Sequence, residues 1–265
     1  MRTSLASKVH KLRYFPPKLF PFLALDAVCF LTGAPLDLII DLRSHFPANI
    51  YDVRTIDGLR FGTRLFRDAT IRDEMDEIAF LNVKPREGDT VLDVGANIGA
   101  YTLRYSKLVG PKGQVVAFEP VPDNRRILLW NLKLNNIQNT TVRPEALAES
   151  DGTALINLSR GPSAESLVKE FHKSGELPVR TVTLDSLRME KLDLAKVDVE
   201  GAELNVLRGA RETLNRLRPR MQIEVHSPHG EGCQVCNWTK DLGYSVRIIH
   251  QKKVGAQIHW VDAYY

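Results

Sequence analysis

The chain has 265 residues, of which 43% are hydrophobic, so it can form one large α/β domain and an extension but not a second catalytic domain. Its formal net charge of +4 is mild and much of the excess lies in the first residues, so the composition gives little support to a dedicated nucleic-acid binder. The three cysteines, Cys29, Cys233 and Cys236, give no even disulfide framework, which is typical of a reducing compartment.

Residues 1–50 are predicted to form a helical extension. Met1 to Lys18 carries basic residues and no acid, and it leads into an apolar segment from Leu19 to Leu31. Proline and aspartate interrupt that segment well short of the roughly 20 apolar residues that a membrane crossing needs. We therefore expect a cytoplasmic protein whose extension packs on the domain or on a second copy in a homo-oligomer. The alternative is peripheral contact of residues 1–40 with an anionic membrane surface.

The predicted domain of residues 51–265 begins with a β-hairpin. Strands at Asp52–Ile56 and Leu59–Thr63 flank Asp57-Gly58, which is a strong two-residue turn signal. This lead-in is placed to form one wall over a bound cofactor. Residues 71–81 follow with apolar side chains at helical spacing and charges between them. We interpret the charges as a solvated helix face, and a lining for an acceptor pocket is the alternative.

The stretch from Thr90 to Leu103 predicts a buried strand, a glycine turn and a helix. Its apolar residues suit a strand buried on both faces, and Asp93 interrupts them near the carboxyl end, so we interpret this carboxylate as a ligand contact. Gly95 and Gly99 lie where the chain must turn sharply and where a ligand must approach the backbone. The helix from about Ala100 points its amide-rich start at that ligand.

The Gly95-x-Asn97-x-Gly99 spacing differs from the dinucleotide fingerprint, which has a further glycine for helix packing. An acid at the strand end and an amide in the turn suit a zwitterionic amino-acid tail that carries a sulfonium. The motif therefore favours S-adenosylmethionine over NAD.

A second predicted strand, residues 114–119, supports that cofactor. It ends in Glu119, about 20 residues beyond the glycine turn, where a carboxylate can bind both ribose hydroxyls. Proline and aspartate then start a helix at residues 124–134. Asn124 at its beginning lies close to the ribose site, and a role in starting the helix is the alternative. Residues 140–144 are predicted to be the third strand.

Residues 152–180 are the least regular part of the chain. A strand at 153–158 leads into a loop with Ser163 and Ser166. Loops over the carboxyl ends of parallel strands commonly carry substrate contacts, so both serines are candidates, with plain turn chemistry as the alternative. A further strand follows, and Asp185 after it is interpreted as a turn or cap residue rather than a catalyst.

A fourth core strand, residues 194–200, carries three charged side chains on one face. Successive side chains alternate between faces, so Lys196, Asp198 and Glu200 share a side. Burying such groups without partners costs several kcal/mol. A purely structural role therefore requires a salt-bridge network, which Lys196 with Asp198 would partly supply. We favour a ligand site.

A fifth strand, residues 220–226, places Gln222, Glu224 and His226 on one face by the same alternation. His226 at its carboxyl end is predicted to project toward the same crevice as Glu200. A helix over residues 202–217 connects the two strands. A helix at 234–242, a strand at 244–250 and a last strand ending at Val261 complete the chain.

Four motifs carry a family resemblance. They are Gly88 to Leu103, Ala117-Phe-Glu-Pro-Val-Pro-Asp-Asn124, Thr183-Leu-Asp-Ser-Leu187 and Lys196-Val-Asp-Val-Glu-Gly-Ala-Glu-Leu-Asn-Val-Leu-Arg-Gly-Ala210. By these motifs together the chain resembles the FkbM-type methyltransferases of the class I S-adenosylmethionine-dependent fold, over most of its length after Tyr51. The resemblance implies an α/β, Rossmann-like fold with a mostly parallel seven-stranded sheet and an antiparallel closing strand.

The resemblance also implies an activity, which is O-methylation of a hydroxyl on a sugar, glycolipid or natural product. In this fold the segment that begins with Glu145 and Ala146 falls beside the adenine. The strand that carries Asp198 ends beside the transferring methyl group, so Asp198 is expected to touch the cofactor and Glu200 the acceptor.

Methyl transfer from a sulfonium is an in-line displacement, so the protein must align the groups and remove the hydroxyl proton. His226 is the predicted base, because an ordinary histidine pKa of about 6.5 leaves it neutral near neutral pH. Asp198 and Glu200 are expected to orient the acceptor, to stabilise the imidazolium, or to act as the base themselves.

Other chemistry stays open at this point. Asp198, Glu200, Glu224 and His226 offer hard ligands to magnesium, and His226, His229, Cys233 and Cys236 are ligand types for zinc. The spacing demands neither ion, so no metal is predicted. The alternative functions are methylation of RNA or another nucleic acid, cofactor binding without catalysis, and dehydrogenation.

Overall fold

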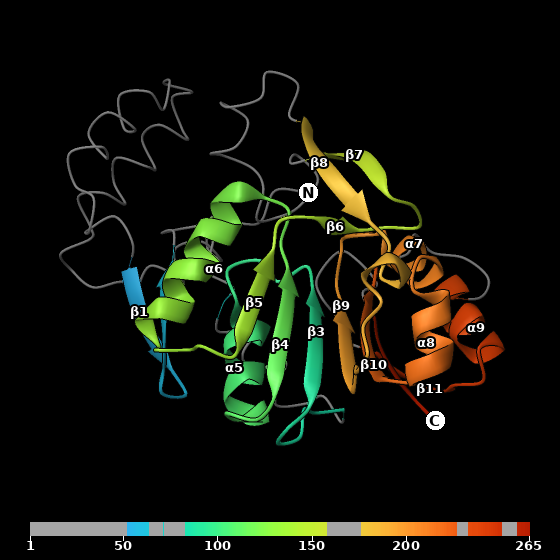
Figure 1. Ribbon diagram of the computed structural model, residues 1–265, viewed down its shortest axis with the longest axis horizontal. Coiled ribbons are helices and arrows are strands. Elements are labelled where there is room, and N and C mark those ends of the chain that lie inside the picture. Colours follow the sequence, from blue (N-terminus) through green and yellow to red (C-terminus); the bar gives the residue numbers. More distant parts are fainter. Residues whose placement is uncertain (1–51, 64–70, 72–82, 158–175, 227–232, 251–258) are drawn as a thin grey trace.

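The computed structural model describes residues 52–63, 71, 83–157, 176–226, 233–250 and 259–265 (Figure 1). Its centre is a seven-stranded sheet in the order β11-β12-β10-β9-β3-β4-β5. The strands are β3 (Thr90–Val94), β4 (Gln114–Phe118), β5 (Thr140–Arg143), β9 (Leu194–Val197), β10 (Arg220–Val225), β11 (Ser245–His250) and β12 (His259–Tyr264). Strand β12 runs antiparallel to both of its neighbours, β10 and β11, and the other neighbouring pairs in this sheet are parallel. The predicted class I methyltransferase fold is confirmed.

Helices cover both faces of the sheet. One face packs under α5 (Ala100–Val109) and α6 (Pro122–Leu134), and the other under α7 (Glu203–Arg208), α8 (Arg211–Leu217) and α9 (Gln234–Asp241). Side chains on β3 alternate between the two apolar clusters, with Val91 in the first and Leu92 in the second. Burial on both faces explains why the parallel strands are nearly continuous apolar runs.

Two predicted elements have different ends in the structure. Strand β9 stops at Val197, so Asp198 and Glu200 lie in the following loop, where Glu200 has a left-handed backbone with φ 55°. The predicted helix 202–217 is two helices that meet at Gly209, where a Cβ atom would lie 1.9 Å from the carbonyl oxygen of Ala148. This close approach of a distant loop is not visible in the helical pattern.

The predicted hairpin is confirmed as β1 (Asp52–Ile56) and β2 (Leu59–Thr63), with positive φ at both Asp57 and Gly58. It packs against α6, where the Asn131 side chain accepts from the Gly62 amide at 2.7 Å and donates to the Ile98 carbonyl at 2.8 Å. Asn131 thus ties the hairpin to the loop ahead of α5. A role for the hairpin as a wall over the cofactor stays a prediction.

A second, three-stranded sheet has the order β6-β8-β7, built from β6 (Ala146–Leu147), β7 (Gly152–Asn157) and β8 (Glu176–Val182). Its strands were predicted in part, but their assembly into a separate sheet was not. Figure 1 shows β7 and β8 beyond the ends toward which β4 and β5 point, so this sheet lies on the side where class I ligands are expected.

Several predictions fall outside the described residues. They concern the extension 1–50, the helix 71–81 apart from Ile71, and the loop with Ser163 and Ser166. Among the helices that the structure describes, none is both long and apolar enough to cross a membrane.

Asp185 has the capping role that the sequence predicts. It lies in a short 3-10 turn (Asp185–Leu187), and its carboxylate accepts the amides of Glu212 at 3.0 Å and Thr213 at 2.7 Å. These amides belong to the first turn of α8, which has no intrahelical acceptor for them. Asp185 therefore caps a helix that lies far along the sequence.

Replacing Asp185→Ala is expected to lower the free energy of unfolding by about 1 kcal/mol, because two helix-start amides lose their acceptor. Chemical denaturation measures this change. The matched control is Glu190→Ala, an exposed residue close by in the sequence, for which a change below about 0.5 kcal/mol is expected. Equal effects of the two substitutions would contradict the capping role.

Candidate active site

The glycine turn follows β3, and the packing around it explains its residue types. Gly95 and Gly99 have φ of 80° and 100°, which side chains rarely allow. A Cβ atom on Gly95 would lie 1.8 Å from the Asp198 carbonyl oxygen, and one on Gly99 would lie 2.5 Å from Leu128 Cδ1. The sharp turn was predicted correctly. The close approach predicted for a ligand is made in the structure by the loop after β9 and by α6.

Three predicted cofactor residues, Asn97, Glu119 and Asn124, meet beside this turn. The Glu119 carboxylate accepts the Asn97 amide at 2.7 Å, the Val121 amide at 2.9 Å and the Asn124 side-chain amide at 3.4 Å. Burial raises the pKa of Glu119 above its usual value despite these donors. Asn97 has φ 50°, a conformation that asparagine tolerates better than most residues. The sequence therefore placed these three residues together correctly.

Asp93 lies in the core. Its side chain has no exposed surface, Thr102 Oγ1 donates to its Oδ2 at 2.5 Å, and Lys196 Nζ lies 3.7 Å from its Oδ1. Burial raises the pKa of Asp93, and Lys196 and Thr102 offset this only in part. Asp93 thus contacts protein groups where the sequence predicted a ligand contact.

Lys196 is a buried ammonium that joins Asp93 to Asp198. Its side chain is 2% exposed, and Nζ lies 3.1 Å from Asp198 Oδ2 and 4.7 Å from the Tyr101 ring centre. Burial lowers the pKa of Lys196, but Asp198 and Asp93 outweigh it and raise this pKa. Burial likewise raises the pKa of Asp198, while Lys196 and His226 hold it below its usual range. The salt-bridge network required by the structural alternative is present, and Asp198 still keeps exposed surface.

The predicted adenine segment lies just after β5. Arg143 donates to the Glu145 carboxylate from Nε at 3.0 Å and from Nη2 at 3.1 Å, and this hydrogen-bonded pair lowers the pKa of Glu145. The Glu119 amide donates to the Arg143 carbonyl at 3.1 Å, and Ala146 begins β6. Glu145 and Ala146 are therefore close in the chain to a residue that contacts Glu119, and adenine binding by them stays a prediction.

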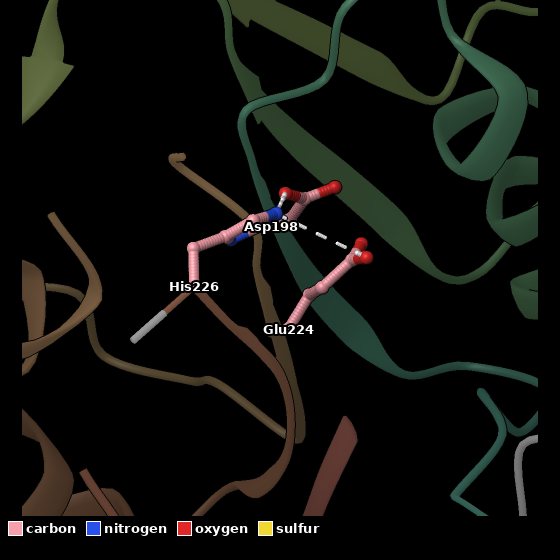
Figure 2. A group of neighbouring side chains, drawn as sticks. All are labelled: Asp198, Glu224 and His226. Atoms are coloured by element: carbon pink, nitrogen blue, oxygen red, sulfur yellow. Dashed lines mark ion pairs between the residues drawn. The ribbon is translucent and has the colours of Figure 1, made fainter. Parts of the chain in front are cut away.

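His226 follows β10 directly and brings the predicted catalytic residues together (Figure 2). Its Nδ1 lies 3.0 Å from Glu203 Oε1. Its Nε2 lies 3.7 Å from Glu200 Oε2 and 4.0 Å from Asp198 Oδ1. Glu224 Oε1 is also 4.0 Å from Nε2. Figure 2 shows the Asp198 and Glu224 carboxylates on the side of the imidazole that carries this nitrogen.

These carboxylates change the expected protonation of His226. Burial lowers the pKa of His226, but the hydrogen bond to Glu203 and the charges of Asp198, Glu203 and Glu200 outweigh it and raise the pKa to about 9. The sequence-based expectation of a neutral imidazole near neutral pH therefore differs from the structure, in which the imidazolium is favoured.

The two metal hypotheses have different outcomes. Ligand atoms of Asp198, Glu224 and His226 all lie within 4.8 Å of one another, so donors for the magnesium alternative lie together, and magnesium binding stays an untested alternative. Cys233 and Cys236 form a disulfide, with 5.1 Å between their Cα atoms. This pairing contradicts the zinc hypothesis, and the sequence analysis, which found no even disulfide framework, did not predict it.

Residues 93–246 match the family model of the methyltransferase FkbM domain. The chain belongs to this family. It is accordingly an S-adenosylmethionine-dependent methyltransferase.

Two relatives and one solved structure show how similar this chain is to known proteins. The hexuronic acid methyltransferase AglP of Haloferax volcanii is 30% identical over 206 residues, which cover 76% of this chain and 80% of the relative. The 31-O-demethyl-FK506 methyltransferase FkbM of Streptomyces tacrolimicus is 27% identical over 217 residues, 68% of this chain and 82% of the relative. A crystal structure of methyltransferase FkbM from Methylobacillus flagellatus KT superposes with a TM-score of 0.49 at 18% identity, over 69% of this chain and 45% of that one.

Sequence reasoning missed Glu203 as a residue of the site. Glu203 is the first residue of α7, and an acid in the first turn of a helix is ordinarily explained by the helix dipole. Its position in the Asp198-Val-Glu-Gly-Ala-Glu203 motif was the available signal. Its hydrogen bond to His226 depends on how α7 packs against the end of β10, which no local pattern contains.

Replacing Lys196→Met is expected to lower the free energy of unfolding by about 3 to 5 kcal/mol, because it leaves Asp93 and Asp198 without their buried cation. The control is Lys191→Met, whose side chain is 57% exposed and pairs with Asp193, so a loss below about 1 kcal/mol is expected. Chemical denaturation compares the two, and similar small losses would refute the buried network.

The raised pKa of His226 predicts a pH-dependent stability. The imidazolium stabilises the fold fully below the unfolded-state pKa of about 6.5, and this contribution is lost as the pH rises through the folded-state value of about 9. The free energy of unfolding should therefore fall over this interval more steeply in the native protein than in His226→Gln. Parallel curves for the two proteins would show that the charge on His226 does not stabilise the fold.

Proposed function

We propose that this FkbM-family methyltransferase transfers the methyl group of S-adenosylmethionine to a hydroxyl of a sugar, glycolipid or natural product. The observation that carries the proposal is the placement of His226 Nε2 within 4.0 Å of carboxylate oxygens of Asp198 and Glu200, next to the glycine turn. The names of the two relatives, which refer to a hexuronic acid and to 31-O-demethyl-FK506, support a small-molecule or saccharide acceptor.

The residues around the glycine turn fit the cofactor. Glu119 offers a carboxylate to the ribose hydroxyls, and Asn97 and Asn124 already hydrogen-bond to it. The backbone at Gly95 lies against the Asp198 carbonyl, so the turn and Asp198 form one surface. Cofactor contacts are therefore assigned to this group together with Gly99 and the Glu145-Ala146 segment. Asp93 supports the surface from the core through Lys196.

The catalytic roles go to His226, Asp198 and Glu200. The cofactor, when bound, supplies a methyl group on a cationic sulfur. Once the imidazolium has lost its Nε2 proton, His226 Nε2 accepts the hydroxyl proton as the acceptor oxygen attacks. Asp198 and the exposed Glu200 orient the acceptor and stabilise the imidazolium that forms. Ser163 and Ser166, outside the described residues, are proposed as further acceptor contacts.

The experiment is methyl transfer from labelled S-adenosylmethionine to sugars, glycolipids and polyketides, with RNA as a separate acceptor. An ether product on a hydroxyl compound is expected. His226→Ala should lower turnover by on the order of 10² to 10⁴ while cofactor binding by calorimetry is kept, because proton transfer loses its base.

Glu190→Gln, on an exposed turn, is the control and should keep full turnover. Labelling of RNA alone would favour a nucleic-acid methyltransferase instead. Tight cofactor binding without transfer to any acceptor would favour a non-catalytic scaffold.

A further inference from the structure

Glu203 is a buried carboxylate that makes two hydrogen bonds at one end of the catalytic cluster. Its side chain is 3% exposed. Its Oε1 lies 3.0 Å from His226 Nδ1 and accepts the Gly201 amide at 2.9 Å. Burying a carboxylate is unfavourable unless its oxygens have donors, so these two bonds fix where Glu203 lies.

We infer that Glu203 is a positioning residue for proton removal: it holds the Nδ1–H of His226 so that Nε2 presents its lone pair to the acceptor hydroxyl. This inference rests on the proposed function. A buried carboxylate behind a histidine base sets both its tautomer and its orientation, and it stabilises the imidazolium formed in the reaction.

The distances around the ring distinguish Glu203 from the other acids. Its contact with Nδ1 has hydrogen-bonding length, whereas the carboxylate oxygens nearest Nε2 are 3.7 to 4.0 Å away. Among the described residues, the charged groups facing the ring are Glu203 on α7, Asp198 and Glu200 in the loop after β9, and Glu224 on β10, with Lys196 behind Asp198. Nδ1 thus hydrogen-bonds to Glu203, while Nε2 faces Asp198 and Glu200, which are proposed to orient the acceptor.

The second hydrogen bond ties Glu203 to the loop that carries the other catalytic acids. Gly201 has φ 106° and follows Glu200 with φ 55°, so two successive residues have left-handed backbone. The Glu203 carboxylate holds the amide at the end of this turn. Glu203 therefore connects the position of Glu200 to that of His226, which keeps the geometry fixed before the acceptor binds.

Atoms and charge balance in the proposed methyl transfer with Glu203 as the partner of Nδ1. The acceptor oxygen gains the methyl carbon while the carbon–sulfur bond breaks with its electron pair on sulfur, and the hydroxyl proton passes to Nε2. The positive charge that leaves sulfur reappears on the imidazolium. Glu203 faces that charge across a short, charge-assisted hydrogen bond.

The first test measures the His226 ring directly. Imidazole resonances of the full-length protein are titrated by nuclear magnetic resonance and assigned with His226→Gln. In Glu203→Gln the amide oxygen still accepts Nδ1–H but the charge is lost. The pKa of His226 should therefore move from about 9 toward the ordinary value of about 6.5. Glu212→Gln removes the first-turn acid of α8 and should leave the titration unchanged. An unchanged titration in Glu203→Gln overturns the assignment.

The second test measures turnover against pH with an acceptor found as above. In Glu203→Gln the rising limb of kcat should move to lower pH, with the KM for the cofactor unchanged. Glu203→Ala also removes the acceptor of Nδ1–H, so kcat at the plateau should fall on the order of 10²-fold. An unmoved limb would mean that Glu203 only stabilises the fold, and it would overturn the inference.

The two tests distinguish a failure of the role inferred for Glu203 from a failure of the proposed function. A shifted His226 titration in a protein that transfers methyl to no acceptor overturns the proposed function, and the catalytic role of Glu203 falls with it. Methyl transfer with an unshifted titration overturns only the role of Glu203.

Discussion

The ammonium of Lys196, held between Asp93 and Asp198, is the interaction on which the site depends. Asp93 and Lys196 are register partners on the neighbouring parallel strands β3 and β9. An ion buried at this depth is stable only with close opposite charges, so the two strands cannot shift relative to each other without breaking the pair. The glycine turn after β3 and the acidic loop after β9 are therefore held in one fixed arrangement.

Asp198 links the buried lysine to His226, because its two carboxylate oxygens face different partners. Oδ2 lies against Lys196 and Oδ1 faces His226, whose other nitrogen bonds to Glu203. Negative and positive groups thus alternate from the core to the start of α7. Each charged side chain is held by the opposite charge next to it, which explains how Lys196 on β9, the residues just after β9 and β10, and Glu203 on α7 share one geometry.

The sequence predicts which of these side chains lie together where strand geometry controls their positions. Side-chain alternation placed Lys196 with Asp198, and the parallel order of strands brought Glu119 to the glycine turn. Prediction failed where long-range packing decides the outcome. The helix break at Gly209 follows from the approach of Ala148, and the burial of Asp93 follows from the partner strand. The pKa of His226 depends on Glu203, which local pattern assigns only to a helix start.

The acidic surroundings of His226 have a consequence for the order of events at the site. The same carboxylates that raise the pKa of His226 to about 9 attract any cation that binds beside them. A second positive charge within a few ångströms in turn opposes the proton on Nε2, because like charges repel strongly where water is excluded. Binding of a cationic ligand is therefore coupled to loss of this proton, and the two cannot be optimised separately. In the proposed reaction a positive charge starts on the ligand and ends on His226, and the carboxylates would stabilise the charge at either position.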